Sequence, residues 1–111
     1  MTTLYRGSHS GTCTPREGQC WTDDNGAAES YAAGGLVVSV EVALSDLVVE
    51  RCAGYDWNAN ETPADDYSFR LEAASRGVDV LLYDDADESG REHRCYRLVS
   101  DRAIAAFAAA M

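Results

Sequence analysis

Apolar and polar side chains alternate along several short stretches of the chain, and this alternation predicts β-strands. The longest such stretch is residues 36–44, LVVSVEVAL, in which Val38, Val40 and Val42 alternate with more polar positions. One face of this strand is therefore expected to be apolar and the other mixed. Shorter strands are predicted at residues 4–6, 19–22 and 48–50.

The last third of the chain has the pattern of a β-hairpin followed by a helix. Residues 78–83 have the composition of a buried strand, and residues 93–99 that of its partner. The acidic stretch 84–90 between them is expected to form the turn. Ser100 then caps a short helix that carries Ile104 and Phe107.

A further helix is predicted early in the chain. Asp23 or Asp24 caps it, it runs to about Ala33, and it ends at the glycine pair Gly34-Gly35. Another helix is predicted in the middle of the chain. Its start signal is Thr62-Pro63-Ala64-Asp65, which combines a threonine cap, a proline and an acid in the manner of a capping box. The residues then expected on its buried face are Ala64, Tyr67, Leu71 and Ala74.

Two polar stretches, residues 7–18 and 51–61, are predicted to be loops, with Tyr55 and Trp57 anchoring the second into the body of the protein. The order of elements is then β β α β β α β β α. Strands separated by helices, with a hairpin near the end, indicate a single α+β domain over residues 1–111 rather than a doubly wound sheet.

Composition narrows the classes of function. The chain has 111 residues, 46% of them hydrophobic, which indicates a globular domain. Nineteen acids against nine bases give a net charge of −10, which argues against nucleic acid and anionic membranes as partners. All nine bases are arginine, so lysine chemistry is excluded.

Apolar stretches, the N-terminus and the cysteines bear on localisation and metal binding. No apolar stretch reaches the ~18 residues of a membrane span, and the N-terminus lacks the pattern of a signal peptide, so a cytoplasmic protein is predicted. The four cysteines, Cys13, Cys20, Cys52 and Cys95, are then expected to be reduced, with a disulfide left open. Their spacings match no zinc module, so no metal site is predicted.

Groups that can carry chemistry stand at three predicted strand ends. The first is Tyr5-Arg6-Gly7, where glycine allows a close approach to the backbone. The second is Trp21-Thr22-Asp23, which leads into the helix that contains Tyr31. The third is Tyr83-Asp84-Asp85, followed in the sequence by Glu92 and His93; neither His9 nor His93 has the neighbours of a catalytic triad.

Together these stretches resemble the ADP-ribosyltransferase superfamily, in particular its small bacterial and phage members. The similar segments follow in order along most of the chain: LYRG (4–7), CWTDDNGAAESYA (20–32), GGLVVSVEVALSDLVVE (34–50) and GVDVLLYDDADESGREHRCYRLVS (77–100). The resemblance implies a split, strongly bent β-core with two to three short helices, and a cleft that binds NAD as substrate without a metal.

The resemblance also implies roles for single residues. Arg6, with Tyr5 and Gly7 beside it, would hold the nicotinamide ribose and amide. Thr22, next to Trp21, would stabilise the cleft, and Tyr31 would stack near the nicotinamide. The family's Gln/Glu-x-Glu motif is replaced here, and the acid that faces the ribose would be Asp84 or Asp85, with Glu92 in reserve.

Two functions follow as expectations. The first is transfer of ADP-ribose from NAD to a protein acceptor, with Arg6, Arg16 or Arg94 on the pyrophosphate. The second is a non-catalytic, acidic docking protein of a phage or mobile element that binds a basic protein surface. Either function would suit a phage-encoded inhibitor of a host defence complex such as a CRISPR effector, and a toxin of a toxin–antitoxin pair is left open as a third alternative. A monomer or weak dimer is expected, because no heptad repeat or large apolar stripe is left unassigned.

Overall fold

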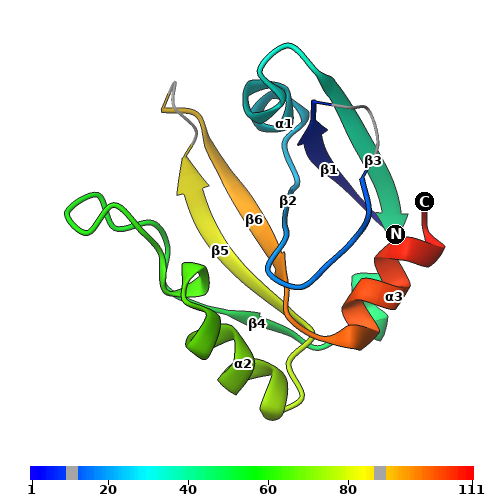
Figure 1. Cartoon of the computed structure of the whole chain (residues 1–111), viewed down its shortest axis with the longest axis vertical. Helices are drawn as coiled ribbons and strands as arrows, with labels where there is room; N and C mark the ends of the chain where they lie inside the picture. Colours follow the sequence, from blue (N-terminus) through cyan, green and yellow to red (C-terminus); the bar gives the residue numbers. More distant parts are fainter. Residues whose placement is uncertain (10–12, 87–89) are drawn as a thin grey trace.

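A six-stranded mixed sheet forms the centre of the computed structural model, which describes residues 1–9, 13–86 and 90–111 (Figure 1). The strands lie in the order β3-β1-β2-β6-β5-β4, and every neighbouring pair is antiparallel except the parallel pair β4–β5. Their bounds are β1 Thr2–Ser8, β2 Cys20–Thr22, β3 Leu36–Val42, β4 Val49–Arg51, β5 Val80–Ala86 and β6 Glu92–Leu98.

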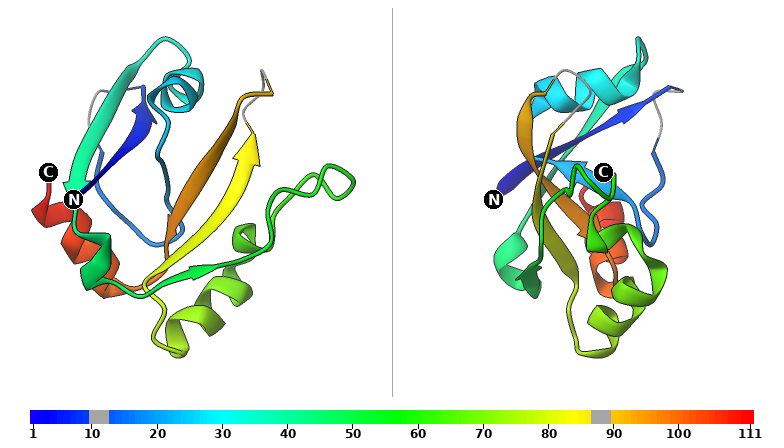
Figure 2. Two further views of the ribbon diagram at one scale, coloured as in Figure 1. Left: turned by 180° about the vertical axis from the view of Figure 1, so that it is seen from behind. Right: turned by 90° about the vertical axis from the view of Figure 1, so that its left-hand side faces the viewer.

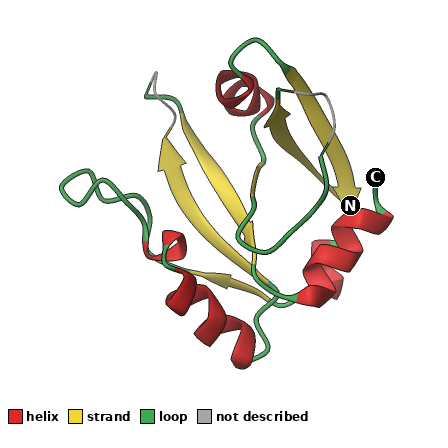
Figure 3. Cartoon of the chain, in the orientation of Figure 1, coloured by secondary structure: helices red, strands yellow, loops and turns green. Residues whose placement is uncertain are grey.

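Three α-helices accompany the sheet, namely α1 (Asn25–Ala32), α2 (Tyr67–Ser75) and α3 (Asp101–Ala109), together with 3-10 turns at Leu44–Asp46 and Pro63–Asp65 (Figure 3). The predicted α+β class and the predicted order of strands and α-helices are confirmed. The longest α-helices have nine residues. Within the described part of the chain, none has the length and hydropathy needed to cross a membrane.

The sheet is bent at β2, and its two halves diverge (Figure 2). β1 and β2 pair at a single position, Tyr5 with Thr22, whereas β1–β3 and β5–β6 each pair along their whole length. Since few hydrogen bonds hold β1 to β2, the β3-β1 half can turn away from the β6-β5-β4 half. This is the physical reason for a bent core in so short a chain.

The bent sheet has an apolar cluster on each face. The larger one lies against α3 and consists of Leu4, Trp21, Val40, Val42, Val80, Tyr96, Leu98, Ala103 and Phe107. The other lies against α2 and consists of Ala64, Ala73, Val78, Leu81, Tyr83, Cys95 and Val99. The valines at alternate positions of β3 behave as predicted, since Val40 and Val42 are buried while Ser39 and Glu41 are exposed.

Several boundaries differ from the sequence predictions. β1 extends through Gly7 to Ser8 instead of ending at residue 6, because Gly7 and Ser8 pair with Val37 and Leu36 of β3. The helix α1 packs directly on Gly7. A Cβ at this position would lie 2.5 Å from the carbonyl oxygen of Ala28 and 2.5 Å from the amide nitrogen of Ala32. The close approach expected at Gly7 is therefore made by a helix. Of the predicted turn 84–90, residues 87–89 lie outside the described part of the chain.

The second helix starts later than predicted, and only part of the predicted face is buried. The capping box at Thr62 is present, but it closes only the 3-10 turn Pro63–Asp65, and Asp66 caps α2. Tyr67 and Leu71, expected in the core, are 58% and 56% exposed. Ala64 and Ala74 pack in the cluster at α2 as predicted, and Ala73 and Phe69 pack there with them.

The prediction that Trp57 anchors the loop 51–61 is also wrong. Its side chain is 69% exposed, and its ring packs edge-on against Tyr55 with centroids 4.8 Å apart. Tyr55 is half-buried and its backbone amide donates to the carbonyl of Asp84. The loop is thus attached to β5 by Tyr55 and by the backbone, while Trp57 packs on Tyr55 from outside.

Candidate functional site

A cleft of about 420 Å³ lies between α1, the β1–β2 pair and the β5–β6 hairpin. We call it the central cleft. All six residues predicted from the family motifs to bind NAD line it, although they come from distant parts of the chain: Tyr5, Arg6, Gly7, Trp21, Thr22 and Tyr31. The remaining lining residues are His9, Cys20, Ala28, Asp85, Cys95 and Arg97.

The structure separates the three predicted acids. Asp85 lines the central cleft, whereas Asp84 and Glu92 do not. Successive residues of a strand point to opposite faces, so Asp84 faces away, is 70% exposed and pairs with Arg51 at 3.1 Å. Glu92, at the start of β6, is exposed as well. Of the three, Asp85 is the one placed to act on a ligand in the cleft.

A chain of hydrogen bonds links α1 to the hairpin through a buried histidine. His93 Nδ1 lies 2.9 Å from Thr22 Oγ1, and His93 Nε2 lies 3.2 Å from Tyr31 Oη. Thr22 Oγ1 also accepts the backbone amide of Asp24 at 3.1 Å, at the start of α1. Tyr31, expected to stack on the nicotinamide, is thus held edge-on against His93 with 46% of its surface exposed.

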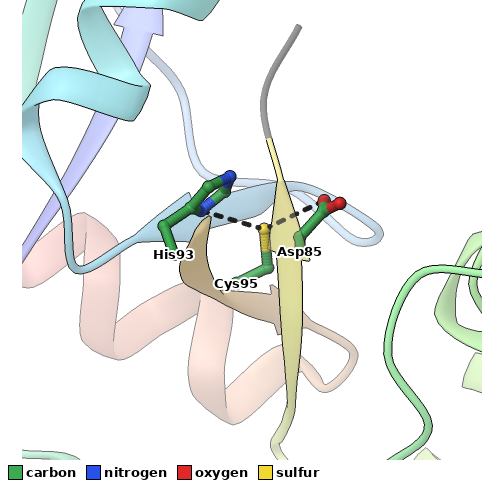
Figure 4. A group of neighbouring side chains, drawn as sticks. All are labelled: Asp85, His93 and Cys95. Atoms are coloured by element: carbon green, nitrogen blue, oxygen red, sulfur yellow. Dashed lines mark hydrogen bonds between the residues drawn. The ribbon is translucent and has the colours of Figure 1, made fainter. Parts of the chain in front are cut away.

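Asp85, His93 and Cys95 point toward one another from β5 and β6 (Figure 4). Cys95 Sγ lies 3.5 Å from Asp85 Oδ2 and 3.8 Å from His93 Nδ1. The strand register accounts for this, because Asp85 is directly opposite His93 and Cys95 is two residues further along the same face. Among the described residues, they form the one group of three or more His, Cys, Asp or Glu side chains whose possible metal-ligand atoms all lie within 4.8 Å of one another.

Two thiols in the cleft have different acidities. A hydrogen bond with Cys95 and the charge of Arg97 hold the pKa of Cys20 below its ordinary value, although burial acts against this. The same contact with Cys20, together with burial, raises the pKa of Cys95. Cys20 is therefore the first of the two to ionise. All four cysteines are free in the structure.

Arg97 was not predicted for the cleft. It donates to Tyr83 Oη at 2.7 Å and to Asp65 Oδ1 at 2.7 Å, and so ties β6 to the turn before α2. Burial raises the pKa of the Tyr83 phenol, which therefore stays neutral and accepts from Arg97. The alternation of His93, Cys95 and Arg97 along one face of β6 was the available sequence signal for this group.

The predicted clustering of arginines is found in part. Arg6 and Arg16 line a hollow of about 570 Å³ that adjoins the central cleft and shares Arg6, Gly7 and His9 with it. Arg94 instead lines a different, larger hollow. One guanidinium nitrogen of Arg6 donates to the carbonyl of Cys20 at 2.8 Å, which fixes the side chain beside β2.

The larger hollow, of about 850 Å³, carries mostly negative charge, and we call it the acidic cleft. Asp85 lines both clefts, so it stands at their junction. The charged side chains that line the acidic cleft are Asp23, Asp24, Asp84, Asp85, Glu92 and Arg94, with Trp57 among the aromatic residues.

Comparisons with known proteins do not assign the chain to a family. It matches no protein-family model, no curated protein sequence and no solved structure. The resemblance to ADP-ribosyltransferases therefore depends on the motifs themselves and on where the structure places their residues.

Proposed function

We propose that this protein is an NAD-dependent ADP-ribosyltransferase that cleaves the nicotinamide–ribose bond in the central cleft and transfers ADP-ribose to a protein acceptor. One observation carries the proposal. Residues chosen from the family motifs, far apart in sequence, line one cleft, and one of the candidate acids, Asp85, lines it with them. The fold class and the bend at β2 agree with such a cleft.

The proposed chemistry assigns a task to Asp85. When the bond between the ribose and the nicotinamide nitrogen breaks, its electron pair leaves with nicotinamide and the ribose carbon becomes positively charged. A fixed carboxylate in a partly dehydrated site stabilises that charge. The acceptor side chain then bonds to the same carbon and releases a proton. Asp85 is half-buried, and the Ala86 amide donates to its Oδ1 at 2.8 Å, which fixes the carboxylate.

The pyrophosphate of NAD would lie toward Arg6 and Arg16. Guanidinium groups bind phosphate oxygens in a bidentate manner, which suits arginine better than lysine for this task. Both side chains line the hollow next to the central cleft. A chain with a net charge of −10 can therefore still offer a locally cationic surface to an anionic substrate.

Release of nicotinamide from NAD by the purified protein tests this function, with Asp85→Asn compared with Asp84→Asn. The two substitutions are chemically identical and adjacent, but only Asp85 lines the central cleft. Asp85→Asn is expected to reduce the rate by about 10²–10³-fold, the usual effect of removing one electrostatic contact to a transition state. Asp84→Asn should stay within about twofold of the wild type, since it removes only a solvent-exposed ion pair.

Equal rates for the two variants would remove Asp85 from the mechanism. No nicotinamide release by the wild type at millimolar NAD, with or without candidate acceptor proteins, would reject the proposed activity. Calorimetry of NAD binding to the wild type and to Arg6→Gln then separates two cases. In one the cleft binds NAD but does not react, and in the other it does not bind NAD.

The acidic cleft favours a second candidate, a cytoplasmic docking protein that binds a basic protein surface of a bacterial host. Its supporting observation is the row of carboxylates beside the exposed Trp57, an arrangement suited to a cationic, partly apolar partner. The double substitution Asp23→Lys with Asp84→Lys should abolish such binding, whereas Arg6→Gln, at a residue that does not line the acidic cleft, should leave it unchanged within about twofold. The reverse result favours the transferase.

A further inference from the structure

We propose that Asp85, His93 and Cys95 bind one zinc ion at the junction of the central and acidic clefts. The inference does not depend on the proposed transferase, and because both use Asp85, a zinc-bound chain would not have this carboxylate free to act on NAD. The spacings of the cysteines do not indicate a metal, because the three ligands come from two strands. Only the pairing of β5 with β6 brings them together.

The separations of the ligand atoms are close to those of a zinc site. Tetrahedral zinc with bonds of about 2.3 Å to sulfur and about 2.0–2.1 Å to nitrogen or oxygen places its ligand atoms about 3.3–3.6 Å apart. Cys95 Sγ is 3.5 Å from Asp85 Oδ2 and 3.8 Å from His93 Nδ1. One ligand atom of each residue lies within 4.8 Å of the other two, so the carboxylate and the imidazole must approach each other by up to about 1.5 Å to reach the separation of a zinc site.

The donor set selects the metal. A thiolate, an imidazole and one carboxylate suit zinc, whereas magnesium and calcium prefer oxygen ligands only. Three protein ligands leave a fourth position for water or another small ligand. That position would open to solvent through the clefts, since Asp85 and Cys95 line the central cleft and Asp85 and His93 line the acidic one.

Neighbouring groups already hold each ligand atom in a suitable orientation. His93 Nε2 contacts Tyr31 Oη at 3.2 Å, the outer-shell arrangement that fixes a metal-binding imidazole. On the other side of the ring, Nδ1 lies 2.9 Å from the Thr22 hydroxyl, 3.4 Å from the carbonyl oxygen of Arg94 and 3.8 Å from Cys95 Sγ, so the metal would replace the contact with Thr22. The Ala86 amide holds Asp85 Oδ1, which leaves Oδ2 facing the sulfur.

Zinc binding exchanges one proton for the metal. In the metal-free protein the Cys95 thiol donates its hydrogen to Asp85 Oδ2. When Zn²⁺ enters, the sulfur loses that proton to solvent and forms the bond to zinc, while Thr22 gives up its contact with Nδ1. The reaction requires no oxidant and no second substrate. Binding should therefore release about one proton per zinc ion at neutral pH.

The test is a titration of the reduced, chelator-treated full chain with Zn²⁺ by calorimetry, repeated in buffers of different ionisation enthalpy. Co²⁺ serves as the spectroscopic probe, since a cobalt–thiolate bond gives a charge-transfer absorption that carboxylates do not. We expect one ion per chain, about one proton released, and the thiolate absorption with cobalt.

Substitutions locate the site. Cys95→Ser should remove the thiolate absorption. It should also weaken zinc binding more than the loss of an outer-shell partner does, which is about 10–100-fold. Tyr31→Phe, at an exposed position whose exchange leaves the core untouched, should weaken binding by about 10-fold. Cys52→Ser and Asp84→Asn, which lie outside the group, should change neither the affinity nor the spectrum.

Failure of the wild type to bind zinc at micromolar concentration would reject the site and leave the three side chains as a hydrogen-bonded cluster. Binding that survives both Cys95→Ser and Tyr31→Phe would also reject it, because the ion would then be held by surface carboxylates. If Cys95→Ser unfolds, as judged by circular dichroism, the Tyr31→Phe result and the cobalt spectrum decide. None of these measurements uses NAD, so the zinc site and the transferase can fail independently.

Discussion

The two faces of the β5–β6 hairpin differ sharply, although alternate residues of the same two strands supply both. On the face toward α3, Val80 pairs with Leu98 and Leu82 with Tyr96, and the surface is apolar. On the other face, Leu81 packs in the cluster at α2, but polar groups follow it along the hairpin, where Tyr83 pairs with Cys95 and Asp85 with His93. These side chains hydrogen-bond to one another and to Thr22 and Arg97.

The difference separates stability from chemistry. The apolar face gains free energy from burial and packing, which favour any well-fitting hydrophobic side chains. The polar face must satisfy each buried donor and acceptor, and in the described part of the chain no buried side-chain nitrogen or oxygen lacks a partner. Substitutions on the two faces should therefore have effects of different size and kind.

Truncation of the apolar face should have the largest effect on stability. Phe107→Ala is expected to lower the free energy of unfolding by about 3–5 kcal/mol, the usual cost of emptying a large aromatic site in a core. Phe107 is fully buried and its ring centroid lies 5.4 Å from that of Trp21. Urea denaturation at pH 7 measures the loss. Phe69→Ala, at a half-buried ring of α2, is the matched control and should cost less. The reverse order would mean that the cluster at α2 dominates the fold.

Removing one hydroxyl from the polar face should have an intermediate effect. Thr22→Val keeps the shape of the side chain but leaves His93 Nδ1 and the Asp24 amide without this partner, at an expected cost of about 1–3 kcal/mol. Thr22→Ser restores the hydroxyl and should recover most of the loss. The same urea experiment, with the histidine resonances followed by NMR, checks both. Equal stability of the valine and serine variants would show that water replaces the hydroxyl.

The smallest effect is expected where the polar face reaches solvent, at the cap of α1. The Arg91 guanidinium beside Asp24 holds the pKa of that carboxyl below its usual value. A pKa that is lower in the folded than in the unfolded state stabilises the fold above the unfolded value of about 3.9. This stabilisation is lost as the pH falls through the lowered, folded pKa.

Asp24→Asn keeps the acceptor for the Gly26 amide but removes the charge. It should cost under about 1 kcal/mol at pH 7, because the ion pair is near the surface. The gap to the wild type should close as the pH falls below about 4. Urea midpoints measured from pH 7 to pH 3 test this, and a gap that persists at pH 3 would mean that the carboxylate acts through the cap and not through its charge.

Local signals predicted much of the secondary structure. Ser100 caps α3 and Asp24 caps α1, as their sequences indicate. A side-chain oxygen placed just before a helix accepts a hydrogen bond from a backbone amide in the first turn of that helix, so the signal does not depend on the rest of the fold. The predictions that failed were about burial. Tyr67, Leu71 and Trp57 are apolar in the sequence, but which of their surfaces meets the sheet depends on where α2 starts and how the loop crosses β5.

The sequence by itself determined the order of strands and helices, the α+β class and the presence of reactive groups at strand ends, because caps and alternation act over a few residues. Only the tertiary structure decided which groups meet. The alternation along β5 turns Asp85, and not Asp84, toward the central cleft, and the register of β5 against β6 places Cys95 beside it. The single pairing of β1 with β2 then lets the sheet bend so that α1 brings Tyr31 to His93. Both depend on pairing between segments far apart in the chain, which no local pattern specifies.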